Sequence, residues 1–448
     1  MTWVAILVAV ATLYLIAAYA LGGPVMLARR LFTALSRRRM RYRPPQDDAI
    51  ASSRFTIPVS VILFTEGETE AAASVAHLLT LTYPEFEVIV VNDGSRPALA
   101  ALREQFELNA CEIFYRRSLE TSPVRSIYRS ASDPRLLVVD CDTDTRGDAL
   151  NCGVNLARYR YICCADLRAR YHSESLLESM HPAVEDPAVV VGMTTMLGVS
   201  AGQTDDPRPS ARGLWQTLER LSASRALLSR AGYRNLSLSP DGLPGLVLWR
   251  RDTLIEVGGF ARDVDSEQVE LTFRMHRHHL RAGLPYRIVH IVEPVGGAAD
   301  DERLRELVAQ QEVRRRAMGA VLWRYRSLLL NPRYGSLGMV DLPRYVFGAL
   351  VVPWFELICL AALPMAPLVG VLSSWHLLLV LVALGLGNAI LLNTALLLAP
   401  AGQHDDDAVR RFILLGPIEL FVSRPVQLYS RLTGMVRMLA RSDAAPLA

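Results

Sequence analysis

The feature that most constrains this chain is a charge-free apolar run near its beginning, from Trp3 to Ala28. The run is long enough to cross the hydrocarbon core of a bilayer, which is roughly 30 Å thick. A secretory signal peptide carries positive charge before its apolar stretch, whereas here the arginines follow it, from Arg29 to Arg43. Because arginine flanks stay on the cytoplasmic side, residues 1–28 are predicted to be a transmembrane anchor and residues 29–55 a basic cytosolic linker.

A second apolar region lies near the end of the chain. Residues 345–400 contain two apolar stretches that meet at Ser373 and Ser374, which predicts two transmembrane helices. Glu356 interrupts the first stretch, and either marks a polar pathway at membrane depth or sits near the lipid headgroups. Residues 401–448 mix leucines with arginines, which indicates a cytosolic loop followed by a C-terminal helix lying in the membrane interface. The expected protein is therefore a multi-pass protein of the cell (inner) membrane whose main domain faces the cytoplasm.

Composition excludes several classes of function. The chain has 48 basic and 45 acidic residues, a balance that argues against a nucleic-acid partner. None of the basic residues is a lysine, which excludes Schiff-base chemistry and the lysine of a P-loop. The six cysteines show no CxxC spacing, so neither a zinc site nor a disulfide framework is indicated, and we interpret them as reduced thiols.

The middle of the chain alternates short strands with helices. Four apolar runs are typical of buried parallel strands, and they are Val59–Phe64, Phe86–Val91, Leu136–Val139 and Tyr161–Cys164. Helical patterns lie between them, at Glu70–Leu81 and Gly147–Arg158. The alternation predicts an α/β domain with a mainly parallel sheet and active groups at the carboxyl ends of the strands. Acidic residues do follow these strands, although helix capping and turns would also explain most of them taken singly.

Several motifs in this domain occur in an order and spacing known from one family. They are PVSVILF, TYPEFEVIVVNDGS, RGDALNCGVNLARYRYICCADL, GLVLWRRDTLIEVGGF, DSEQVELTFRMHR, QQEVR and NPRYGSLG. With its flanking apolar segments, the chain resembles glycosyltransferase family 2, in particular membrane synthases of the poly-N-acetylglucosamine, hyaluronan and cellulose type. The resemblance implies a GT-A type nucleotide-sugar domain over residues 56–298, interfacial helices over residues 299–344, and a UDP-sugar as the donor substrate.

The resemblance also assigns roles to residues on the donor side of the site. Asp93 in VNDGS takes the place of the aspartate that contacts uracil, and Asp148 in GDALN matches the next donor-side motif. Gln311 and Arg314 match the phosphate-facing residues of a Gln-x-x-Arg-Trp motif. For Asp93 and Asp148, a plain structural role in a turn or at a helix start remains the alternative.

Three other positions depart from the family pattern. The Asp-x-Asp that meets Mg²⁺ or Mn²⁺ reads Asp166-Leu167-Arg168, so a metal ion is doubtful, and Arg168 either pairs with the diphosphate itself or faces solvent. The aspartate that serves as general base is replaced by Gln268, which follows Glu267. The tryptophan that forms a platform for the acceptor sugar is replaced by Arg315.

These substitutions lead to two functional hypotheses. In the first, the protein takes part in surface polysaccharide synthesis with impaired or lost catalysis, as a scaffold or regulator for a partner synthase or envelope complex. In the second, it is an active glycosyltransferase that moves a hexose from a UDP-sugar to a glycan acceptor at a metal-independent site.

Overall fold

The computed structural model describes residues 2–17, 57–67, 70–143, 145–167, 169–197, 244–298, 317–396, 418–425 and 428–429. Ten strands in this part of the chain form one sheet, with the order β3-β4-β5-β2-β1-β6-β9-β8-β10-β7. The strands are β1 Val59–Thr65, β2 Phe86–Asn92, β3 Leu108–Ala110, β4 Val124–Ser130, β5 Leu136–Cys141, β6 Tyr161–Ala165, β7 Ala169–Tyr171, β8 Val189–Leu197, β9 Pro244–Arg250 and β10 Arg287–Ala298. Strands β4, β7 and β9 run against the other seven, so the sheet is mixed and mostly parallel.

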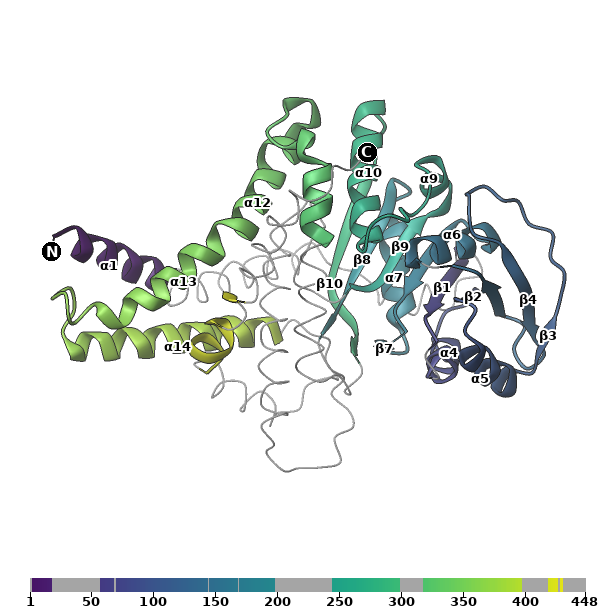
Figure 1. Ribbon diagram of the computed structural model, residues 1–448, viewed down its shortest axis with the longest axis horizontal. Helices are drawn as coiled ribbons and strands as arrows, with labels where there is room; N and C mark the ends of the chain where they lie inside the picture. The colour runs from purple at the N-terminus through teal and green to yellow at the C-terminus, as the bar shows by residue number, and fades with distance from the viewer. Residues whose placement is uncertain are drawn as a thin grey trace.

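Helices cover both faces of this sheet (Figure 1). They are α4 Ala71–Leu79, α5 Arg96–Phe106, α6 Arg146–Leu156, α7 Ser175–Glu185, α9 Arg251–Glu256 and α10 Glu267–Ala282. The four strands predicted from the sequence are confirmed as β1, β2, β5 and β6, and the two predicted helices as α4 and α6. The predicted α/β domain with a mainly parallel sheet is therefore confirmed.

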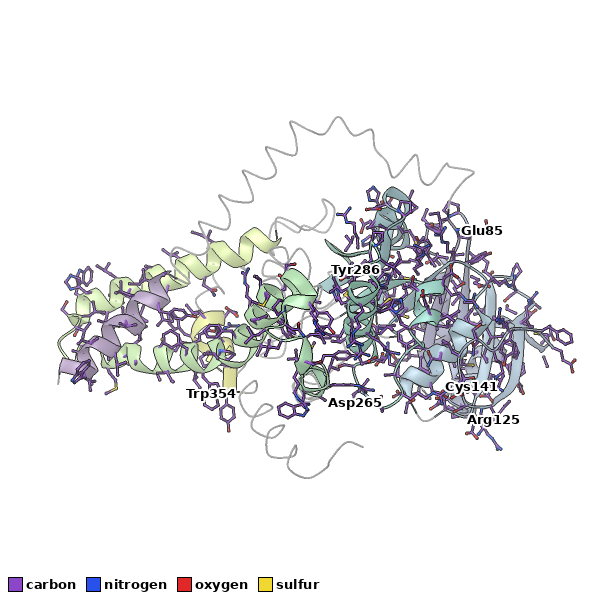
Figure 2. The ribbon with its side chains drawn as sticks, turned by 90° about the horizontal axis from the view of Figure 1, so that it is seen from above. Glu85, Arg125, Cys141, Asp265, Tyr286 and Trp354 are labelled. Carbon is purple, nitrogen blue, oxygen red and sulfur yellow. The ribbon has the colours of Figure 1, made fainter. Side chains whose placement is uncertain are left out.

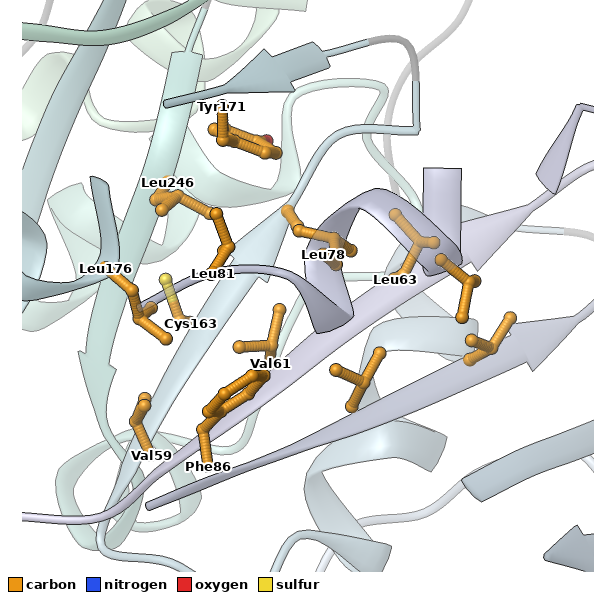
Figure 3. Packing of buried hydrophobic residues seen from close by; sticks show 14 of the residues in the cluster. Val59, Val61, Leu63, Leu78, Leu81, Phe86, Cys163, Tyr171, Leu176 and Leu246 are labelled. Atoms are coloured by element: carbon orange, nitrogen blue, oxygen red, sulfur yellow. The ribbon is translucent and has the colours of Figure 1, made fainter. Parts of the chain in front are cut away.

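Successive side chains of the central strands pack alternately into two hydrophobic cores, one on each face of the sheet. Val59, Val61 and Leu63 of β1 pack toward α4 and α7, together with Phe86, Leu78 and Leu176 (Figure 3). The intervening Ile62 and Phe64 pack on the opposite face with residues of α6 and α10. Every residue of β1 and β2 is buried, as expected when alternate side chains of a strand enter cores on both faces.

Apolar helices lie at the far end of the molecule from the sheet (Figure 1), and they are α1 Thr2–Leu15, α13 Val352–Ala362 and α14 Ser374–Leu396. Another helix, α12 Leu342–Leu350, lies between them and the sheet domain, and its Leu342 and Tyr345 pack with Phe273 of α10. Within the described residues, one helical run, Leu337–Met365, is long and apolar enough to cross a membrane, while α1 and α14 contribute shorter apolar stretches. Large apolar side chains are exposed on these helices, such as Leu7 on α1, Ile358 on α13 and Leu386 on α14.

Glu356 of α13 is buried inside the protein. Both of its carboxylate oxygens accept hydrogen bonds of 2.8 Å from Arg424, which follows the short helical segment Glu419–Ser423. Leu420 of that segment is also buried and packs with residues of α1, α13 and α14. The described part of the C-terminal segment is thus packed among the apolar helices.

Candidate functional site

Polar residues lie together where the central parallel strands end. The registers Thr65 to Asn92 and Asn92 to Asp140 place the carboxyl ends of β1, β2 and β5 side by side, and β6 continues the row on the other side of β1. Since these strands are parallel, the residues that follow them collect on the same side of the sheet. These residues are Glu66, Asp93, Asp142 and Asp166. They form the strand-end edge, where the sequence predicted the active groups.

Asp93 lies in a tight turn at the strand-end edge. Its Oδ1 accepts a hydrogen bond of 3.0 Å from the backbone N–H of Ser95, and Gly94 between them has a φ of +87°. A Cβ on Gly94 would come within 2.5 Å of Nη1 of Arg125. Arg125 in turn pairs with Asp142 at 2.6 Å, and both side chains are largely exposed. Asp93 is half-buried, and the guanidinium group of Arg125 lies against the next residue of the turn, Gly94, a neighbour that the sequence did not indicate.

The carboxylate of Asp148 is engaged inside the protein. Asp148 lies in the first turn of α6, accepts a hydrogen bond of 3.1 Å from the backbone N–H of Ser122, and pairs with Arg262 at 3.0 Å. Only 5% of its side chain is exposed. In the free protein, Asp148 thus joins the start of α6 to the segments that carry Ser122 and Arg262.

Two asparagines lie on the same face of α6 as Asp148, and these three side chains form a polar stripe along the helix. Asn151 donates a hydrogen bond of 2.8 Å to the carbonyl of Phe260 and accepts one of 2.7 Å from its N–H. One turn further, Asn155 bonds to the backbone of Ser118 and Leu119. Residues 148, 151 and 155 share one helix face, so α6 fastens two separate loops with one row of side chains.

Glu267 and Arg146 form an ion pair at the strand-end edge. Nε of Arg146, the first residue of α6, lies 3.1 Å from Oε1 of Glu267, the first residue of α10. The Glu267 side chain is 7% exposed and that of Arg146 is 36% exposed. Burial raises the pKa of Glu267 above its usual value, with Arg146 opposing the shift. Burial alone would lower the pKa of Arg146, but Glu267, Asp166 and Glu66 outweigh it and raise that pKa.

Gln268 is half-buried in the first turn of α10, next to Glu267. The remaining acidic residue of this turn, Glu270, is buried and accepts a hydrogen bond of 2.6 Å from the hydroxyl of Tyr325 while it pairs with Arg274. Asp265 is exposed ahead of the helix, on the side of the sheet domain that faces the apolar helices (Figure 2). The first turn of α10 thus carries an amide, Gln268, at the position of the expected general base, and the carboxylates of Glu267 and Glu270 beside it are ion-paired with arginines.

Asp166 follows β6, and its backbone N–H donates a hydrogen bond of 2.8 Å to the hydroxyl of Tyr171. In the described part of the chain, no group of three or more His, Cys, Asp or Glu side chains is arranged to hold a metal ion. At the Asp-x-Asp position the structure describes Asp166 and Leu167, which supply one carboxylate. Arg168, Gln311, Arg314 and Arg315 lie outside the described residues.

Comparison with known proteins defines the class. A mannosyltransferase from Pyrobaculum calidifontis, solved in complex with GDP-Man and Mn²⁺, superimposes with a TM-score of 0.50 and 18% identity over 93% of this chain and 99% of that one. S. aureus TarS in complex with UDP-GlcNAc is a further neighbour, with a TM-score of 0.40 and 14% identity over 76% of this chain and 89% of that one. The superposition on the mannosyltransferase shows that the α/β domain has a GT-A-like fold.

A family model matches part of the chain. Residues 59–233 match the model of glycosyl transferase family 2, the family that the motifs of this part of the chain resemble. A curated relative, the poly-beta-1,6-N-acetyl-D-glucosamine synthase of Staphylococcus epidermidis, is 22% identical over 223 residues, which are 49% of this chain. The chain spans 45% of the length of that relative.

Proposed function

We propose that the protein is a membrane-bound member of the family that binds a nucleotide sugar, with its transfer activity impaired or lost, and that it serves surface polysaccharide synthesis as a scaffold or regulator. The start of α10 carries this proposal. Gln268, an amide, stands where the family has its base, and an amide does not accept the acceptor's proton at physiological pH. Glu267 and Glu270 on either side are held by Arg146, Arg274 and Tyr325.

Transfer and donor binding are tested separately. Full-length protein in nanodiscs is expected to bind UDP without Mg²⁺ and to incorporate no radiolabelled sugar from UDP-sugars, with or without divalent metal. Asp93→Ala should weaken UDP binding by roughly 1.5–3 kcal/mol, because the base loses a charged hydrogen-bond acceptor. Calorimetry measures the affinity and scintillation counting the polymer. Label in polymer would contradict impaired catalysis, and failure to bind UDP would contradict the donor site.

An active, metal-independent hexosyltransferase is the second candidate, favoured by the ion pair at the strand-end edge. Arg146 supplies a permanent positive charge among Glu66, Asp166 and Glu267. Glu267 is a buried carboxyl whose pKa burial raises, a property shared by many proton-transferring residues. Under this proposal, Arg146 replaces a metal ion beside the diphosphate and Glu267 accepts the proton of the acceptor hydroxyl.

The membrane topology remains a proposal of one N-terminal span, a cytoplasmic domain, two further spans and a cytoplasmic tail, with the domain boundaries given by the sequence. The exposed apolar side chains of α1, α13 and α14 support it, since they suit contact with lipid. A cysteine placed at Ser374, between the two C-terminal apolar stretches, is expected to react with a membrane-impermeant reagent in intact cells, and one at Arg37 is not. The labelling must be done in a variant whose native cysteines are shown to be unreactive. The opposite pattern would contradict the topology.

A further inference from the structure

Arg146 brings a positive charge to the strand-end edge. Its side chain leaves the start of α6, and about a third of it is exposed, whereas the carboxylate that it meets is almost wholly buried. Glu66 and Asp166, which follow β1 and β6, also act electrostatically on Arg146. The Arg146 side chain is thus partly open to solvent while its Nε lies against Glu267.

Carboxylate and diphosphate oxygens use the same donors of a guanidinium group. Both bind its N–H groups in a planar arrangement, often with two hydrogen bonds in parallel. A diphosphate arriving at the strand-end edge therefore meets Arg146 with its donors partly used by Glu267. Glu267 lies almost wholly buried at the first position of α10, whereas the side chain of Arg146 is longer, has more rotatable bonds and is 36% exposed.

We propose that Glu267 is an internal competitor for the diphosphate of a nucleotide ligand: its carboxylate holds Arg146 in the free protein, and the diphosphate takes its place in the complex. The proposal rests on the proposed donor binding at this edge. It gives the residue before Gln268 an autoinhibitory contact, in either of the two functional candidates.

The exchange has an energetic consequence. When Arg146 turns to the diphosphate, Glu267 loses its cationic partner. The neighbours that remain, Asp265 and the buried thiol of Cys164, supply no positive charge in its place. The loss of this partner opposes binding and lowers the affinity for any ligand that carries a diphosphate. A ligand that carries only the nucleoside does not displace Arg146 and is spared this cost.

Calorimetry on full-length protein in nanodiscs, with UDP and uridine as the two probes, tests the inference. Glu267→Gln is expected to tighten UDP binding by about tenfold and to leave the affinity for uridine unchanged, because the amide competes weakly for a guanidinium group. Arg146→Met should weaken UDP binding by at least about tenfold, and adding Glu267→Gln to it should restore nothing.

Glu87 offers a matched control. It is another buried glutamate, 8% exposed, that lies 3.4 Å from an exposed arginine, Arg158, away from the strand-end edge. Glu87→Gln should leave both affinities unchanged. Thermal unfolding of each variant shows that it is folded, and Glu267→Asp, which shortens the side chain, is the substitute if Glu267→Gln does not fold and should also tighten UDP binding.

The outcomes separate this inference from the proposed function. Unchanged or weaker UDP binding by a folded Glu267 variant would overturn the competition, and so would an equal gain for uridine. If the protein binds uridine, and binds UDP no more tightly than uridine, the role of Arg146 would be overturned while the site for the base would stand. No binding of either probe would overturn the proposed donor site, and the competition with it.

Discussion

Replacing Arg424 with Met is expected to lower the free energy of unfolding by about 3–5 kcal/mol. Arg424 is 12% exposed and Glu356 is 3% exposed, and two parallel hydrogen bonds of 2.8 Å join them. Without Arg424, the carboxylate of Glu356 stays buried among apolar helices with these two bonds lost. Burying an unpaired charge costs far more than an ion pair contributes at a protein surface, so the effect should be among the largest in the molecule.

Thermal unfolding in detergent, followed by tryptophan fluorescence, measures this effect. An exposed pair provides the comparison: Arg125 and Asp142 are 46% and 63% exposed, and Arg125→Met should cost less than about 1 kcal/mol. Adding Glu356→Gln to Arg424→Met should recover most of the loss, because no charge then remains buried. Equal small losses for the two arginine variants would show that the Glu356–Arg424 pair is not buried in the folded protein.

The same pair shows what a single sequence does and does not reveal. Strands such as β1 and β2 were predictable because continuous β-branched runs suit burial on both faces of a sheet. The partner of Glu356 was not predictable, because it lies 68 residues further along the chain and nothing local indicates the contact. Sequence reasoning therefore left Glu356 between a polar pathway and the headgroup region, while its burial depends on how the helices pack.

In the candidate site, too, the positions of the acidic residues were predictable from the sequence and their side-chain partners were not. The acidic residues after parallel strands were expected at one edge, since strand direction alone determines that placement, and the structure brings them there. The partners of Asp148 and Glu267 come from Ser122, Arg262 and Arg146, which distant loops and helices deliver. Motif matching identifies such positions, but it does not show whether their carboxylates face a ligand or another part of the protein.

Gly259→Ala is expected to lower the free energy of unfolding by about 3–4 kcal/mol, because three costs combine. Gly259 has a φ of +76°, which a residue with a Cβ adopts at a cost. That Cβ would lie 2.5 Å from Oδ1 of Asn151 and 2.7 Å from Cδ1 of Leu119, so both side chains must move. Moving Asn151 breaks its two hydrogen bonds to the backbone of Phe260.

Gly283 separates these costs, because it has a φ of +64° and nothing lies within 4 Å of the Cβ that alanine would add. Gly283→Ala should therefore cost only about 1–2 kcal/mol, the price of the backbone conformation alone. Asn151→Ala should reproduce the part of the Gly259 effect that comes from lost hydrogen bonds, roughly 1–3 kcal/mol. Chemical unfolding followed by circular dichroism compares the three variants. An equal loss for the two glycine variants would mean that Asn151 does not hold the loop before α10. The expected difference would show that Asn151 of α6 anchors this loop. The loop leads directly into α10, so the same contact then helps to hold Glu267 at the strand-end edge.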